Sequence, residues 1–377
     1  MPAFSEFRTC RLLAWSIFLL AGSGCGGAAK SAPAASQTTA PTIRAAPALN
    51  GAVVVTLSST TSGATIYYTT DGTTPNPSSQ LYQAPFLVAS NLTVDAMAVA
   101  GGHANSSVAS QSFSPNIPSG TLVWSDEFNN ATGANAEPNP AVWTYDTGAD
   151  GWGNHELEDY CSWNSSISPC TPSAPNAYAG KDGYLHVVAK QPSAGVYTSA
   201  RMKTEGLFSF QYGRVEFRAK VPEAQGLWPN LYLMGNTIAN LGWPKCGEMD
   251  VLERVGAAKL PDWNKGQVHG PGYSDDNDSL GTDYKYPAGQ TAAGWHTYGM
   301  IWSKGSVAYY VDTPQHPYVT YTVSSIRGLS DAVWPFDSGN SFILLHLAVG
   351  GDWPGKPSVS THFPSEMLVD YVRIYTN

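Results

Sequence analysis

Apolar and polar residues alternate with a period of two along much of the chain, and no long segment places apolar residues at helical spacing. In GRVEFRAKV (213–221) apolar side chains alternate with charged ones, which predicts a strand with one buried face. HTYGMIWSKGSVAYYVD (296–312) predicts two strands around a Lys-Gly turn, and MLVDYVRIY (367–375) predicts another. FILLHLAV (342–349) is an apolar run typical of a strand buried on both faces. We therefore expect an all-β protein.

Two stretches of small, polar and proline residues divide the chain. GGAAKSAPAASQTTAP (26–41) has the composition of a flexible tether, and SPNIPSG (114–120) is a second linker. Residues 42–115 contain four strand-like runs and the turn-forming DGTTPNPSS, which predicts a small β-sandwich module. Residues 116–377 are expected to form one large domain, a two-sheet sandwich of jelly-roll type.

The module has a recognisable segment, TIYYTTDGTTPNPSSQLYQAPFLV (65–88). It resembles the small β-sandwich at the C-terminus of chitobiases and hexosaminidases, which recurs as an accessory module in bacterial carbohydrate enzymes. Two roles are open. The module either binds glycan or is a spacer that lifts the next domain from a surface.

The first 25 residues have the layout of an export signal. Arg8 and Arg11 precede an apolar run over residues 12–21, which at roughly ten residues is too short to span a bilayer. The small residues before Cys25 resemble a bacterial lipoprotein signal, although Gly22 stands where that signal usually has leucine. We expect an exported protein, either anchored to the bacterial cell envelope through a lipid on Cys25 or cleaved nearby and secreted.

The net charge and the cysteines limit the kinds of partner and the bonding that we expect for this protein. The net charge of −9 argues against a nucleic-acid partner, which calls for a basic surface. In an exported chain, Cys161 and Cys170 bracket a short loop and are expected to form a disulfide. Cys246 is then an odd thiol, for which we expect a buried packing role rather than a catalytic one. We expect a monomer that meets a membrane only through a lipid anchor.

The segment CGEMDVLERV (246–255) crowds three carboxylates into six positions. On a flat strand Glu248 and Asp250 share a face, and Glu253 points to the other. One extra residue, a β-bulge at Val251–Leu252, would turn Glu253 back beside the other two. If the three carboxylates act together at a site, the strand must contain this bulge. If they only line a solvated strand face, no bulge is needed.

Two chemistries could use such a row. A hard cation wants oxygen ligands from several directions, and side chains along one strand make a poor cage. Glycoside hydrolysis needs one carboxylate and one carboxylic acid, and a carboxylate between them would keep the pKa of the acid high. Strand spacing alone separates the outer Cα atoms by roughly 13–16 Å, so the side chains would have to lean together to reach the ~5–5.5 Å of a retaining enzyme.

Aromatic residues accompany the row. In GLWPNLYLMG, Trp228 and Tyr232 share a strand face with Asn230, and Trp243 lies just before the carboxylates. Sugar rings stack on aromatic faces, so aromatic residues beside carboxylates predict a saccharide cleft.

These motifs give the large domain a clear resemblance. GEMDVLE matches the Glu-x-Asp-x-x-Glu signature of glycoside hydrolase family 16 in its laminarinase form, and WSDEFN, GWGNHELEDY, DGYLHVVA, VHGPGYS and LAVGGDWPG agree in order over residues 122–377. The resemblance implies a concanavalin-like β-jelly-roll sandwich that cleaves β-1,3-glucan internally, with retention and without a catalytic cofactor. It assigns Glu248 as the nucleophile, Asp250 as its partner and Glu253 as the acid/base.

Further residues follow from the same resemblance. The motifs that line the family's cleft contain Asn154, Arg201, Trp228, Trp243 and His269, and Tyr232 joins them through the face it shares with Trp228. The family's structural calcium would be held by Glu127, the backbone of Gly183, and Asp370. Asp370 also shares a predicted strand face with Leu368 and Val372, where a carboxylate needs a partner. An arginine or backbone N–H groups could supply that partner equally.

Two departures from the family pattern bear on the substrate. Asn230–Leu231–Tyr232 stands where the family usually has Ala-Phe-Trp, and His346 stands where it usually has asparagine. The alternatives are another β-glucan or galactan hydrolase or transglycosylase of this fold, or a non-catalytic glucan-binding protein. The cleft motifs carry little positive charge beyond Arg201, which disfavours a sulfated substrate. Both glutamates are kept, which disfavours a binding protein.

Overall fold

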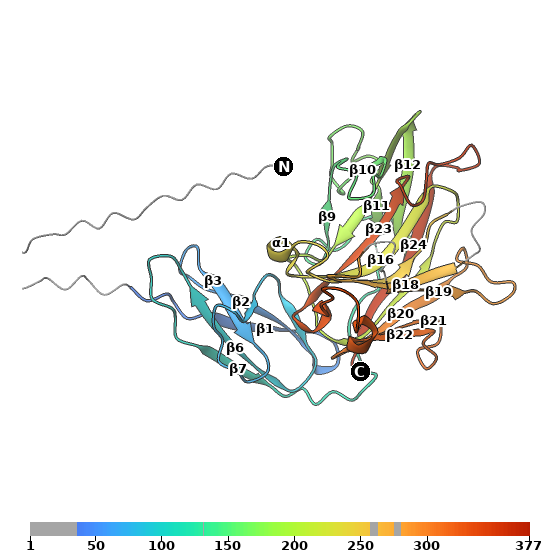
Figure 1. The fold of residues 1–377 in the computed structure, drawn as a ribbon. Helices are drawn as coiled ribbons and strands as arrows, with labels where there is room; N and C mark the ends of the chain where they lie inside the picture. Colours follow the sequence, from blue (N-terminus) through green and yellow to red (C-terminus); the bar gives the residue numbers. More distant parts are fainter. Residues whose placement is uncertain (1–35, 131, 257–262, 275–279) are drawn as a thin grey trace, which may run out of the picture. The chain divides into compact units, whose positions relative to one another are not determined.

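A computed structural model describes residues 36–130, 132–256, 263–274 and 280–377 (Figure 1). The export signal, Cys25 and tether residues 26–35 lie outside the described residues. The described chain is almost entirely strands and turns, which confirms the predicted all-β class. Its one α-helix is the four-residue α1 (Ile238–Leu241), and within the described ranges no helix is long and apolar enough to cross a membrane.

The module consists of two small antiparallel sheets. The first contains β1 (Thr42–Pro47), β2 (Val53–Ser58) and β5 (Phe86–Val88) in that order, and the second has the order β4 (Gln80–Leu81), β3 (Thr65–Thr69), β6 (Leu92–Val99) and β7 (Ala109–Phe113). A separate apolar core, including Val55, Tyr68, Phe86 and Val94, lies between them. The four predicted strand runs of this region correspond to β2, β3, β6 and β7.

The large domain contains a ten-stranded sheet. Its members are β8 (Leu122–Asp126), β10 (Glu158–Tyr160), β11 (Ala177–Ala179), β12 (Leu185–Ser193), β13 (Val196–Ser199), β15 (Gly213–Lys220), β20 (His296–Ser303), β21 (Ser306–Val311), β22 (Val319–Thr322) and β24 (Ser365–Tyr375). The order is β10–β13–β12–β24–β15–β20–β21–β22, with β11 beside β12 and β8 beside β24.

A seven-stranded sheet forms the second layer. Its members are β9 (Thr144–Asp146), β14 (Arg201–Lys203), β16 (Leu227–Gly235), β17 (Glu248–Glu253), β18 (Trp263–His269), β19 (Leu280–Lys285) and β23 (Ser341–Val349). The order is β19–β18–β17–β16–β23–β14–β9, so strands distant in sequence lie side by side. Short 3-10 turns complete the elements at Leu49–Gly51, Val323–Ile326 and Pro335–Asp337.

The main core lies between these two sheets. Apolar residues of β15 and β24, such as Phe217 and Val369, meet those of β16 and β23, such as Leu231 and Leu345. Because successive strand residues point to opposite faces, the other side of the seven-stranded sheet is left for polar and aromatic residues. We call this side the site face; it carries Trp228, Asn230, Tyr232, His346 and the carboxylate row.

A β-bulge in β17 places the carboxylates. Asn230 of β16 pairs with Glu253, Leu231 with Leu252, and Tyr232 with Asp250, so Val251 has no partner in that ladder. The β17–β18 pair shifts register at the same place. The bulge predicted at Val251–Leu252 is therefore confirmed.

A second bulge corrects the prediction for β24. Ala219 of β15 pairs with Val369, but Arg218 pairs with Tyr371, so Asp370 is the extra residue. The bulge moves Val372 and Ile374 into the core and leaves Asp370 partly exposed on the outer side. The prediction that Asp370 shares a face with Val372 was wrong, because simple alternation ignores the inserted residue.

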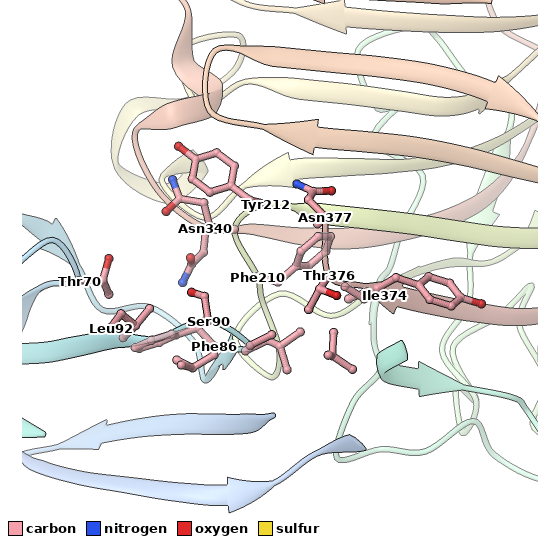
Figure 2. Close-up of a pocket in the computed structure, with 17 residues that line it drawn as sticks. Thr70, Phe86, Ser90, Leu92, Phe210, Tyr212, Asn340, Ile374, Thr376 and Asn377 are labelled. Atoms are coloured by element: carbon pink, nitrogen blue, oxygen red, sulfur yellow. The ribbon is translucent and has the colours of Figure 1, made fainter. Parts of the chain in front are cut away.

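Backbone pairing joins the module to the large domain. The N–H of Leu87 donates to Ser209 O, and the N–H of Ser209 donates to Pro85 O, both at 2.9 Å. The Asn340 amide donates to the Tyr68 hydroxyl at 3.0 Å. A pocket of about 330 Å³ lies at this junction between Phe86, Phe210 and the C-terminal residues (Figure 2). None of the residues that line it has an Asp, Glu, His, Lys or Arg side chain.

The cysteines follow the predicted pattern. Cys161 and Cys170 form a disulfide. Cys246 is a buried free thiol that packs with Met234, Phe342 and Leu344 beside α1. Burial, and then the charge of Glu248, raises the pKa of the Cys246 thiol to about 12, so this thiol stays protonated. This agrees with the predicted packing role.

Candidate active site

Three carboxyl side chains line the site face along β17. The bulge at Val251 brings Glu253 to the same side as Glu248 and Asp250, although Glu253 stands three positions after Asp250. Asn264 of β18 holds the bulge: its amide oxygen accepts the N–H of Glu253 and its amide nitrogen donates to Val251 O, both at 3.2 Å. The inserted residue is thus fixed by hydrogen bonds on both of its sides.

Asp250 is the buried member of the row. Its side chain is fully buried, and the Asn230 amide donates to Oδ1 at 2.9 Å. His269 Nε2 lies 3.5 Å from Oδ2, too far for a strong hydrogen bond. Burial, followed by the charges of Glu248 and Glu253, raises the pKa of Asp250 well above its usual range. These surroundings favour the protonated form of Asp250 more than water does.

The pKa of Glu253 is also raised. Glu253 is 6 % exposed, and burial together with the charge of Glu248 raises its pKa to about 8. Lys265, its register partner in β18, lowers the pKa in part. The carboxyl at this end of the row can thus donate a proton near neutral pH, which a general acid must do.

Glu248 differs from the other two carboxyls because it is more exposed. Its Oε2 accepts a 2.6 Å hydrogen bond from the Trp243 indole N–H. The ring of Trp243 also packs 5.8 Å from that of His269, the register partner of Glu248. Trp243 is 47 % exposed, so it orients Glu248 and still offers ring surface to solvent.

Arg201 lies in β14, which is three strands from β17 in the sheet order. Its Nε is 3.1 Å from the Asp146 carboxylate of β9, and the guanidinium lies 5.2 Å from the Trp152 ring and 5.9 Å from the Tyr232 ring. Tyr232 is only 1 % exposed. Its ring is covered by its neighbours and packs beneath Arg201, and its contact with substrate stays a prediction.

Trp228, Trp353 and Asn154 form a polar and aromatic group beside the row. The Trp228 and Trp353 rings meet edge to face at 5.2 Å, and Trp353 is 40 % exposed. The backbone N–H of Trp353 donates to Asn154 Oδ1 at 3.2 Å, while Asn154 Nδ2 is buried without a partner. Exposed rings and an unpaired donor next to carboxylates suit a sugar ligand.

Comparison with known proteins agrees with this geometry. The family model described as glycosyl hydrolases family 16 matches residues 170–363, just over half of the chain. The chain belongs to glycosyl hydrolases family 16. The model of the chitobiase/beta-hexosaminidase C-terminal domain matches residues 45–110, within the N-terminal module.

Individual relatives of this family-16 chain include glucanases. It is 36 % identical to a beta-glucanase of Rhodothermus marinus over 70 % of its own length and 87 % of the relative's. It is 33 % identical to glucan endo-1,3-beta-glucosidase A1 of Niallia circulans over 69 % of its length, but spans only 38 % of that protein. The laminarinase catalytic domain of Thermotoga maritima matches with a TM-score of 0.59 at 35 % identity, covering 69 % of this chain and 99 % of that domain.

Family 16 membership makes the chain a glycoside hydrolase of jelly-roll fold that needs no catalytic cofactor. The disulfide fits an extracellular protein. The family assignment and the fold of the large domain thus agree with the sequence-based prediction.

The expected calcium ligands have other partners in this structure. Arg373 binds both carboxylate oxygens of Glu127, at 2.9 and 2.8 Å, and Arg218 donates to Asp370 Oδ2 at 2.5 Å. Gly183 lies in a turn with a φ of 86°. Among the described residues, no group of three or more His, Cys, Asp or Glu side chains could hold a metal ion. As placed, these side chains do not form a calcium cage.

Several residues of the site were missed by the sequence analysis. Trp353 and Trp152 lie in loops, where no strand period marks their direction. Glu158 and Glu156 form a buried pair under Arg201: Glu158 accepts the Val349 N–H at 2.8 Å, and Tyr160 donates to Glu156 at 2.8 Å. The motif GWGNHELEDY contains this pair, but its burial depends on strands far away in the sequence.

Proposed function

We propose that this chain is an endo-acting, retaining hydrolase of β-1,3-glucosidic bonds in laminarin-type glucans. Glu248 acts as the nucleophile, Glu253 as the acid/base, and Asp250 supports Glu248. The proposal rests on the catalytic domains it resembles, which are laminarinases and endo-1,3-glucanases. One observation in the chain itself carries it: a bulge sets a buried glutamate with a pKa of about 8 on the same face as a partly exposed glutamate.

The first step forms a glycosyl-enzyme intermediate. A carboxylate oxygen of Glu248 attacks the anomeric carbon, the glycosidic C–O bond breaks, and the departing sugar oxygen takes the proton of Glu253. The Trp243 indole hydrogen bond fixes the attacking carboxylate. A protonated Glu253 is needed here, and its burial supplies one at neutral pH.

The second step hydrolyses the intermediate. Glu253, now a carboxylate, takes a proton from water as the water oxygen attacks the anomeric carbon, and Glu248 leaves. Two displacements at the same carbon restore the β configuration. Asp250 lies between the two glutamates, and burial and like charges raise its pKa, which disfavours a third negative charge in the row.

Residues around the carboxylate row bind the substrate in this proposal. Trp243, Trp228 and Trp353 offer ring surfaces, and Asn154, Arg201 and His269 offer polar groups. Tyr232 is assigned a packing role under Arg201. Arg201 is paired with Asp146, which leaves little unpaired positive charge for a sulfated polysaccharide.

The experiment is product analysis on laminarin, lichenan and agarose in parallel, with time courses of chain length. Laminarin should be cut internally into short oligosaccharides, with slower cleavage of lichenan and none of agarose. Agarose cleavage without laminarin cleavage would reject the proposed substrate. Glucan binding without any product would instead favour a binding protein.

Other properties remain predictions. We propose that the chain is exported and monomeric, and that Cys25 carries a lipid; mass spectrometry of the mature N-terminus tests the lipid. A structural calcium would have to draw Glu127 and Asp370 away from their arginines. A melting temperature that falls on chelation would establish that ion. An unchanged value would leave the arginines as the partners of both carboxylates.

A further inference from the structure

His346 of β23 is a buried side chain on the site face that has no hydrogen-bond partner. It is 3 % exposed, and neither Nδ1 nor Nε2 makes a hydrogen bond. Buried polar groups in folded proteins are almost always paired, so an exception requires an explanation. An apolar side chain at this position would avoid the free-energy cost of leaving two buried polar atoms without a hydrogen bond.

The side chains around His346 hold its ring in place but form no hydrogen bond with its nitrogen atoms. Trp228 and Tyr232 pack edge to face against the imidazole at 5.6 and 5.4 Å, and the Tyr160 ring lies 6.3 Å away. Its register partners are Asn230 in β16, whose amide donates to Asp250, and Arg201 in β14, whose Nε lies by Asp146. The Asn230 amide nitrogen is therefore engaged with Asp250, whereas Asn230 Oδ1 and Arg201 Nε, like the imidazole, have no hydrogen-bond partner.

The imidazole is neutral. Burial, and then the charge of Arg201, holds the pKa of His346 well below its usual range. A neutral imidazole presents one N–H donor and one nitrogen acceptor. A hydroxyl group matches either nitrogen, because it both donates and accepts. A sulfate or carboxylate only accepts, and so leaves the acceptor nitrogen unpaired.

The position of His346 separates it from the reacting bond. His346 pairs with Asn230, which in turn pairs with Glu253, so two strand spacings, about 10 Å, lie between His346 and Glu253 in the sheet. A ligand group at His346 therefore belongs to a sugar that does not react. Asn154 Nδ2, another unpaired buried donor, is linked through Trp353 and Trp228 to the same group of side chains.

We propose that His346 determines specificity by hydrogen-bonding a hydroxyl of a non-reacting glucose unit in an uncharged β-glucan. This inference rests on the proposed function and adds a residue to it. The unpaired imidazole lowers the stability of the free enzyme, and bound substrate supplies the missing hydrogen bond.

The test compares His346→Leu, which removes both polar atoms, with His346→Gln, which keeps a donor and an acceptor. His346→Leu should lower kcat/KM on laminarin by about ten-fold or more, chiefly through KM, because the lost contact is made to a non-reacting sugar. It should keep or raise the melting temperature. His346→Gln should recover most of the affinity. A short aryl β-glucoside that reaches only the carboxylates should be cleaved equally by all three proteins.

His186→Leu is the matched control, since His186 pairs with Asp182 and Glu366 on the ten-stranded sheet, away from the row. It should lower the melting temperature and leave kcat/KM unchanged. The inference is overturned if His346→Leu cleaves laminarin like the wild type, or if it loses stability and loses activity equally on long and short substrates. A wild type that does not cleave laminarin would reject the proposed function instead, and the same comparison would then be made on the polysaccharide that it does cleave.

Discussion

Asn230 lies opposite Glu253 in the β16–β17 ladder, yet its side chain donates a 2.9 Å hydrogen bond to Asp250. One asparagine thus spans both sides of the bulge. Without the inserted Val251, residues 250 and 253 could not both be near this side chain, because an odd spacing places them on opposite faces. The alignment of the three carboxyl side chains on one face therefore depends on a single inserted residue.

Deletion of Val251 should therefore abolish cleavage almost as completely as Glu253→Ala. Losing the extra residue restores plain alternation and turns either Glu253 or the two acids before it away from the site face. We expect kcat/KM on laminarin to fall by at least about 10²-fold, the usual contribution of a general acid. Steady-state kinetics and circular dichroism of the purified variant provide the measurement.

Val251→Ala is the matched control for the deletion. It trims the same side chain but keeps the residue count, and with it the bulge. Some stability should be lost, since Val251 is fully buried, while most of the activity remains. If the deletion variant folds and cleaves laminarin at a wild-type rate, the bulge is not what aligns the row.

The pH profile should report the raised pKa of Glu253. The protonated form donates to the leaving group, so kcat/KM should fall as the pH rises through about 8. The sign of the stability effect is the same: the folded state holds this proton more tightly than the unfolded chain, so stability falls between the usual glutamate pKa and about 8. Glu253→Gln should remove this part of the slope in a thermal-unfolding series.

Lys265→Met tests the cause of that pKa. Lys265 lies opposite Glu253 and lowers its pKa, so its removal should move the alkaline limb of kcat/KM to higher pH. Lys220→Met, on the exposed end of β15 in the other sheet, should leave the limb unchanged. A limb at the same pH in the Lys265 variant would mean that another group titrates there.

Local sequence patterns were sufficient to predict strands such as β15, β23 and β24 and the carboxylate row of β17, but not the short strands β9, β11 and β14. The out-of-step Glu253 predicted a bulge, because a row of acids is useful only on one face. The β24 bulge at Asp370 was missed for the opposite reason: a continuous pattern of apolar residues gave no sign of an insertion, and the cause lies in pairing with Arg218 and Ala219, far away in sequence.

Burial within the site could not be predicted from strand period alone. Tyr232 and Trp228 have the same predicted direction, yet Tyr232 is covered while Trp228 is partly open. Tyr232 packs with Cys246 and Met234 beside α1. Its exposure depends on how the chain folds back after β16, which alternation along β16 does not encode. The unpaired state of His346 likewise depends on strands from three parts of the chain.

Removing the module should cost stability rather than turnover. Its contacts with the large domain reach Ser209 and Asn340, and none of these hydrogen bonds involves the carboxylate row. A chain beginning at Asn116 should keep its kcat on soluble laminarin and melt at a lower temperature. Tyr68→Phe removes one of these bonds and should cost about 0.5–1.5 kcal/mol. A many-fold drop in kcat on soluble substrate would show that the module supports the cleft.

The two glutamates should be distinguished by the configuration of their rescue products. With Glu253→Ala, a substrate whose leaving group needs no proton should still form the glycosyl-enzyme, because Glu248 remains. Azide can then attack in place of water, and the second displacement yields a β-glycosyl azide. With Glu248→Ala, azide performs the only displacement and yields the α-glycosyl azide. Proton NMR of the isolated azides separates the two.

Wild-type enzyme provides the reference for this pair of variants. Its first product should have the β configuration, observed by proton NMR before mutarotation, because two displacements at one carbon retain the original stereochemistry. Glu366→Ala, which alters an exposed carboxylate on the ten-stranded sheet, should behave like the wild type and give no azide product. An α-configured first product would reject the assignment of both glutamates. Such a product requires a single displacement by water and leaves no role for Glu248 as a nucleophile.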